Sequence, residues 1–129
     1  MDAQIIRIPT YVVVVHDQPT ALDELSSALG QAGHDVAAFN DPMAALGALD
    51  TSQRIDILVT SVDFSPGTLH GIALARMAQA KRPLIKVVFA AGAEFAEFAE
   101  GFGIFMPTPL NVRDVVKTVE SIIDPSYKV

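Results

Sequence analysis

The sequence lacks cysteine and tryptophan altogether, and only 19% of its 129 residues are charged. Without cysteine the chain has no disulfide, no zinc-thiolate site and no thiol nucleophile, which is typical of a cytoplasmic protein. Basic residues are also few, since 9 Lys and Arg stand against 15 Asp and Glu and give a net charge of −6. This balance disfavours binding to nucleic acid. Unbroken apolar runs such as residues 11–15 are far shorter than the roughly 20 residues that cross a bilayer, so we expect no membrane span.

Apolar surface is what the sequence does contain, since 50% of its residues are hydrophobic. A chain of this length and composition can bury one core without a disulfide or a structural metal. No repeat, low-complexity stretch or linker divides it. We therefore predict a single domain over residues 1–129, with a core at 11–123 and tails at 1–10 and 124–129.

Five apolar or β-branched runs alternate along the chain with five stretches whose apolar residues recur every three to four positions. The runs predict strands at residues 11–15, 35–39, 55–62, 87–89 and 104–106. The periodic stretches predict helices at 19–32, 42–49, 72–81, 94–100 and 112–123, and the fourth has room for little more than two turns. This alternation predicts an α/β fold, a doubly wound parallel sheet with helices on both faces.

Ligands of a doubly wound sheet bind beyond the carboxyl ends of its strands. The segments expected there are residues 16–17, 61–71, 90–93 and 106–109. At the start of the last predicted helix, Asn111 followed by Asp114 resembles a capping box.

Four of these stretches resemble the receiver domains of bacterial two-component response regulators, the CheY-like domains, over roughly residues 11–123. They are VVVVHDQP at 12–19, DILVTSV at 56–62, PG at 66–67 with GIALA at 71–75, and FMPTPL at 105–110. The resemblance implies a flavodoxin-like sheet of five strands in the order 2-1-3-4-5. It also implies a fourth helix about one turn shorter than is usual in the family, and a slightly long loop at 61–71.

The family's chemistry depends on five positions at the sheet edge. Two acidic residues after the first strand bind magnesium, and an aspartate that ends the third strand accepts a phosphoryl group. A Thr or Ser ends the fourth strand, and a Lys before a proline ends the fifth. Carboxylates suit magnesium, and the metal and the lysine neutralise the charge of the phosphoryl oxygens.

This sequence departs from that pattern at four of the five positions. His16 stands at the first acidic position, and only Asp17 remains of the pair. Ser61 occupies the acceptor position, Ala91 the Thr/Ser position and Thr108 the lysine position. A serine needs an adjacent base, and a histidine with one carboxylate is a weak magnesium site. We therefore predict a degenerate pseudo-receiver that is not an enzyme, holds no cofactor or metal, and signals by phosphorylation-independent protein contact.

The resemblance also carries expectations about partners and conformation. It implies a protein partner such as a histidine kinase or another regulator, with a homodimer through the last helix face as a further possibility. Phe105 occupies the family's switching aromatic position, but Ala91 offers no hydroxyl, so we expect Phe105 to be ordinary core. The Thr108-Pro109 peptide bond is expected to be cis, as in the family.

Two alternatives stay open. Asp63 restores the family's loop spacing to Gly71 and would then be the phosphoacceptor, with magnesium as its cofactor. Alternatively, the vacated crevice over Ala91 and Thr108 binds a small ligand, as in other flavodoxin-like proteins.

Ordinary structural roles compete with function at several of these positions. Asp17, the weak metal candidate, is expected to accept backbone N–H bonds at the start of the first helix. A zinc- or nickel-type site of His16, Asp17 and His70 is the less favoured hypothesis. Thr60 and Ser61 could take a phosphate from a kinase, but hydroxyls at a strand end more often bond to backbone.

Overall fold

The computed structural model describes residues 10–51, 54–64 and 69–123. Within these ranges the chain forms a five-stranded, all-parallel sheet in the order β2-β1-β3-β4-β5. The strands are β1 (Tyr11–Val15), β2 (Asp35–Phe39), β3 (Ile57–Thr60), β4 (Lys86–Ala91) and β5 (Ile104–Pro107). The helices are α1 (Pro19–Gln31), α2 (Pro42–Leu49), α3 (Gly71–Lys81), η1 (Ala93–Phe95), α4 (Ala96–Ala99) and α5 (Val112–Ile123). The predicted fold class and strand order are confirmed.

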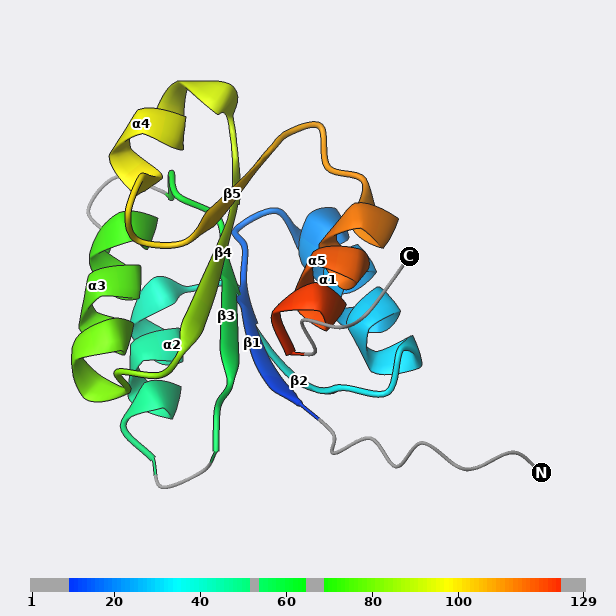
Figure 1. Cartoon of the computed structure of the whole chain (residues 1–129), viewed down its shortest axis with the longest axis horizontal. Helices are drawn as coiled ribbons and strands as arrows, with labels where there is room; N and C mark the ends of the chain where they lie inside the picture. Colours follow the sequence, from blue (N-terminus) through cyan, green and yellow to red (C-terminus); the bar gives the residue numbers. More distant parts are fainter. Residues whose placement is uncertain (1–9, 52–53, 65–68, 124–129) are drawn as a thin grey trace.

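Helices cover both faces of the sheet, with α1 and α5 on one side and α2, α3 and α4 on the other (Figure 1). The side chains of β1 divide between two cores. Val12 and Val14 pack toward α1 and α5, whereas Val13 and Val15 pack toward α2 and α3. The apolar run of β1 is consecutive because both faces of this interior strand are covered. None of the helices in the described ranges is long and apolar enough to span a membrane.

The third strand is shorter than the predicted strand at residues 55–62. Its hydrogen bonding to β1 nevertheless continues past both ends. The N–H of Asp56 donates to the carbonyl of Tyr11 at 2.9 Å, and the N–H of Ser61 donates to the carbonyl of Val15 at 3.0 Å. The backbone therefore follows β1 over residues 56–61, as predicted, but only Ile57–Thr60 have regular strand geometry.

The connection between β4 and β5 is reduced to one 3₁₀ turn and one α-helical turn, η1 and α4. This confirms the prediction of a short fourth helix. Gly101 follows with a φ of 88°, a left-handed conformation that side chains with a Cβ rarely adopt, and it turns the chain toward β5. A segment this short buries only part of its apolar residues, and Phe98 remains 64% exposed.

Polar side chains accept backbone N–H groups at the starts of α2 and α5. Asp41 accepts the N–H of Met43 at 3.1 Å before α2. The Asn111 side chain accepts the N–H groups of Arg113 and Asp114 at 3.0 and 3.3 Å before α5. These bonds confirm the part of the predicted capping box in which Asn111 is the acceptor. These bonds satisfy donors that the first turn of a helix leaves free.

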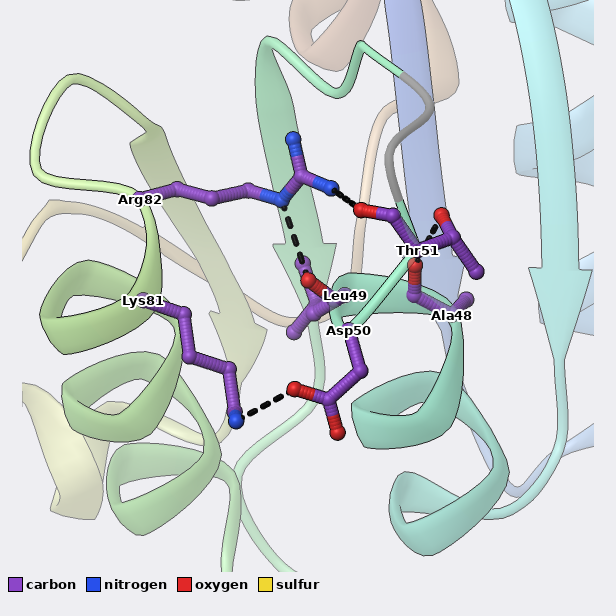
Figure 2. A network of polar contacts seen from close by, with 6 residues as sticks. All are labelled: Ala48, Leu49, Asp50, Thr51, Lys81 and Arg82. Carbon is purple, nitrogen blue, oxygen red and sulfur yellow. Dashed lines mark hydrogen bonds and ion pairs between the residues drawn. The ribbon is translucent and has the colours of Figure 1, made fainter.

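The end of α3 is tied to the end of α2 by two basic side chains (Figure 2). Arg82 donates from Nη2 to the carbonyl of Thr51 at 2.7 Å and from Nε to that of Leu49 at 3.2 Å. Lys81 Nζ lies 2.5 Å from Asp50 Oδ1. The bonds from Arg82 satisfy carbonyls at the end of α2, and together with the ion pair they hold the two helices side by side over their face of the sheet.

Candidate functional site

The carboxyl ends of the strands meet at one edge of the sheet, as parallel pairing requires. In the observed register Val15 is opposite Thr60, and Ala91 is opposite Pro107. The residues that end or follow these strands therefore share that edge, as the sequence predicts. They are His16, Ser61, Ala91 and Thr108.

His16 is buried, and its imidazole is held by the backbone. The imidazole Nδ1 accepts the backbone N–H of Gln18 at 3.0 Å, and the backbone N–H of His16 donates to the carbonyl of Phe39 at 3.1 Å. Burial lowers the pKa of His16 below its ordinary value of 6.5, against an opposing effect of Asp17, whose Oδ1 lies 3.6 Å from Nδ1. An Nδ1 that accepts a hydrogen bond carries no proton, so His16 is neutral and its proton is on Nε2.

Asp17 does not cap α1. The helix begins after Gln18 without a side-chain cap, and the nearby backbone donor of Gln18 is taken by His16. The prediction that Asp17 accepts backbone N–H bonds at this helix start is therefore wrong. Its side chain is 30% exposed, and Asp17 is the sole carboxylate among the five positions that correspond to the family's site.

Ser61 follows β3 directly and is only 6% exposed. The preceding hydroxyl, Thr60 Oγ1, donates to the carbonyl of Ser61 at 2.8 Å, which confirms the predicted backbone bond for Thr60. The start of α3 closes over this strand end, because the N–H of Gly71 donates to the carbonyl of Val62 at 2.9 Å. Ser61 therefore lies in a packed corner between β3 and α3.

Asp63 lies farther along the chain, past this packed corner, and is exposed. Two residues, Ser61 and Val62, separate it from the end of β3. The motif PG at 66–67 in the same loop lies outside the described residues. In this register the side chain directly after β3 is the hydroxyl of Ser61, and the carboxylate of Asp63 comes two residues later in the loop.

Ala91 and Thr108 are brought together by a backbone bond, since the N–H of Thr108 donates to the carbonyl of Ala91 at 2.9 Å. The Thr108-Pro109 peptide bond is cis, as the resemblance implies. Phe105 is half-buried and packs against the core on the α2 and α3 side, which agrees with its prediction as a core residue. The edge formed by β4 and β5 thus presents a methyl group and a neutral hydroxyl.

The histidine-based metal hypothesis gains no support from the geometry. Within the described ranges no three His, Asp or Glu side chains converge closely enough to hold a metal ion. His70 instead caps α3, with Nδ1 accepting the N–H of Ile72 at 3.3 Å. Its ring also meets Phe95 edge-on, with 6.3 Å between the ring centroids.

A second region, which none of the motifs above indicates, lies between α3 and the η1–α4 segment. It is a hollow of about 450 Å³, lined mainly by apolar side chains, together with the polar side chains of Arg76 and His70. The sequence signal that could have pointed to it is a set of three phenylalanines within eight residues, in a connection too short to bury them. These are Phe95, Phe98 and Phe102.

No protein-family model and no curated protein matches the sequence. Solved structures do resemble the fold. A response regulator receiver protein from Sinorhizobium medicae WSM419 has 23% identity and a TM-score of 0.81, covering 90% of this chain and 95% of that one. A CheY-like receiver domain protein from Methanospirillum hungatei JF-1 has 19% identity and a TM-score of 0.81, with coverage of 92% and 96%. The BeF3-activated DrrB receiver domain has 21% identity and a TM-score of 0.77, with coverage of 91% and 99%. The chain therefore has the CheY-like, flavodoxin-like fold of receiver domains.

Proposed function

We propose that this chain is a single receiver-like signalling domain, with its core at residues 11–123, that acts by protein contact without phosphoryl transfer. The fold is that of receiver domains in solved structures. The observation that carries the proposal is that the side chain directly after β3 is the buried hydroxyl of Ser61, in place of a carboxylate.

Among the residues that the structure describes, no general base is hydrogen-bonded to the Ser61 hydroxyl. A serine hydroxyl attacks phosphorus only when a neighbouring group accepts its proton. His16 is the imidazole that shares this sheet edge, but its Nδ1 lone pair is occupied by the N–H of Gln18 and its Nε2 carries the proton. The imidazole therefore has no lone pair to offer to Ser61.

Compensation of phosphoryl charge is also poor at this edge. Asp17 is a single carboxylate beside a neutral imidazole, whereas magnesium prefers several oxygen ligands. Thr108 contributes no positive charge at the end of β5. Because phosphoryl transfer depends on cations that neutralise the phosphoryl oxygens, these residues support a domain that is not an enzyme and uses no cofactor.

Coupling of a phosphate to the surface would also be broken. Ala91 has no hydroxyl to bond a phosphate, and Phe105 is packed against the core. We therefore place the working surface on β5 and α5, where Ile104 and Ile123 are 43% and 39% exposed. The partner in this proposal is a cytoplasmic histidine kinase or another regulator, or a second copy of the chain.

The test is a set of ¹H–¹⁵N spectra recorded with magnesium and beryllofluoride, and separately with acetyl phosphate. The wild-type chain is expected to show no saturable amide shifts near Ser61. The positive control is the triple variant His16→Asp, Ser61→Asp, Thr108→Lys, which restores the family's acid pair, acceptor and cation. We expect this variant to respond to beryllofluoride only when magnesium is present.

Asp63 gives the outcome that would overturn the proposal. Magnesium-dependent, hydroxylamine-labile phosphorylation of the wild-type chain, lost in Asp63→Asn, would identify a working phosphoacceptor in the exposed loop. Saturable shifts around Ser61 in the wild-type chain would contradict the proposal equally.

A further inference from the structure

The hollow between α3 and the η1–α4 segment is large enough for a small molecule. Its volume of about 450 Å³ lies within the roughly 300–1,000 Å³ of ligand pockets in general. Phe95, Phe98 and Phe102 line it from one side, and Ile72 and Ala73 of α3 line it from the other. The walls therefore offer a flat apolar body several ring faces and edges.

The polar side chains of the lining are hydrogen-bond donors. Arg76 carries only N–H groups, and its guanidinium carbon lies 5.6 Å from the centroid of the Phe102 ring. Within the described residues Arg76 has no carboxylate within ion-pair distance. His70 uses Nδ1 to accept the N–H of Ile72, so in its neutral form its free nitrogen, Nε2, is also a donor.

Side-chain donors on an apolar wall suit a ligand with an apolar body and an acceptor group. We infer that this hollow binds a small carboxylic acid with a flat apolar body, its carboxylate against Arg76 and its body against the phenylalanines. The planar guanidinium fork of arginine matches a carboxylate in a two-point hydrogen bond. The lining includes none of the five positions that correspond to the family's site, so the inference does not depend on the proposed signalling function.

Charge on the neighbouring segment favours a small acid over an acidic protein surface. Glu94, Glu97 and Glu100 are exposed along η1, α4 and the following residue. An acidic partner surface would meet like charges there, whereas a ligand with a single carboxylate meets Arg76 alone. Arg76 is also reachable from its other side, because it lines an adjoining hollow of about 380 Å³ with Ala73 and Met77.

The test is a ¹H–¹⁵N titration of the full chain with naphthalene-2-carboxylate and, as a neutral probe of the same shape, naphthalene-2-carboxamide. We expect saturable shifts in residues 72–77 and 95–102. We expect the acid to bind about ten-fold more tightly than the amide, because a hydrogen bond to a charged group exceeds a neutral one by about that factor.

Three variants separate charge from shape. Arg76→Gln is expected to weaken the acid about ten-fold and leave the amide unchanged, so that the two probes bind alike. Arg113→Gln, an exposed arginine on α5, is expected to change neither. Phe98→Ser removes an exposed ring and is expected to weaken both probes equally. For each variant, a ¹H–¹⁵N spectrum that matches the wild-type spectrum outside the site shows that the variant is folded.

Each remaining outcome would overturn the inference. Equal binding of the acid and the amide to the wild-type chain would show that Arg76 does not select a carboxylate. Shifts spread over α5 or the sheet edge would place binding elsewhere, and the lack of any saturable shift would exclude the site. Shifts of residues 72–77 and 95–102 on simple dilution of the protein would show that a second copy of the chain occupies the hollow.

Discussion

His34 and Glu120 share a hydrogen bond of 2.5 Å between Nε2 and Oε2, although 86 positions separate them in the sequence. Both side chains are almost completely buried, at 4% and 5% exposure. His34 lies in the turn between α1 and β2, and Glu120 lies on α5. The pair therefore joins α5 to the turn that follows α1, within the helical layer that these two helices form.

Removal of the imidazole is expected to destabilise the chain strongly. In His34→Leu the buried carboxylate of Glu120 loses this hydrogen bond, and we expect a loss of about 2–3 kcal/mol in the free energy of unfolding. Urea denaturation followed by far-UV circular dichroism measures it. The double variant His34→Leu, Glu120→Leu is expected to recover part of the loss, because an apolar side chain then replaces the buried carboxyl group.

The exposed pair of Lys81 and Asp50 is the matched control for that experiment. Its side chains are 37% and 60% exposed, so water screens the charges (Figure 2). Asp50→Asn is expected to cost less than about 1 kcal/mol. Equal losses for the buried and the exposed pair would contradict the importance assigned to burial.

Two glycine-to-alanine changes are expected to act in opposite directions. A Cβ on Gly71 would lie 2.0 Å from the carbonyl oxygen of Ser61 and 2.7 Å from Cα of Val62, both of them backbone atoms. Gly71→Ala is therefore expected to cost about 3 kcal/mol. Gly47 lies inside α2 with no heavy atom near its Cβ position, so Gly47→Ala is expected to add about 0.5–1 kcal/mol. Thermal unfolding of both variants gives the comparison, and a harmless Gly71→Ala would contradict the packed corner at Ser61.

His16 is expected to make stability fall in mildly acidic solution. Its folded-state pKa lies below the unfolded value of 6.5, mainly because the imidazole is buried. Between these two values the unfolded chain binds more protons, so stability is complete above the unfolded pKa and is lost as the pH falls toward the folded pKa.

His16→Asn is the control for this pH effect, because the amide oxygen of asparagine can accept the Gln18 N–H without titrating. Between about pH 7.5 and about pH 5 the wild-type chain is expected to lose more stability than His16→Asn, as measured by urea denaturation. Parallel curves for the two proteins would show that His16 contributes nothing to the pH dependence.

Loss of the α5 cap is expected to have a moderate effect. Asn111→Ala removes the acceptor for the N–H groups of Arg113 and Asp114 and is expected to cost about 1 kcal/mol. Asn111→Asp keeps an acceptor at the helix start and is expected to cost little. If the two substitutions lower the midpoint of denaturation equally, the side-chain bonds do not stabilise the helix.

Local patterns in the sequence account for most of the fold. The strand at residues 11–15 and the helix at 112–123 were predictable to the residue, because the strand is a consecutive β-branched run and the helix has apolar side chains every three to four positions. The ends of β3 were not, because Asp56 and Ser61 continue its hydrogen bonding outside regular strand geometry.

The candidate site was predictable in location but not in detail. Parallel pairing places His16, Ser61 and Thr108 at one edge whatever their side chains do. The capture of the Gln18 N–H by His16 rather than Asp17 depends on the three-dimensional course of the turn. The contact of Arg76 with Phe102 joins two separate elements, so no local pattern reveals it.

The position of β1 between β2 and β3 in the sheet has a consequence for biosynthesis. Its five residues leave the ribosome before β3 has been made, although β3 is the strand that must cover one of its edges. Until then a short, uncharged, β-branched segment is exposed, and such segments aggregate readily. Substitutions that delay the docking of β3 are therefore expected to reduce the yield of folded chain before they alter anything that the folded chain binds.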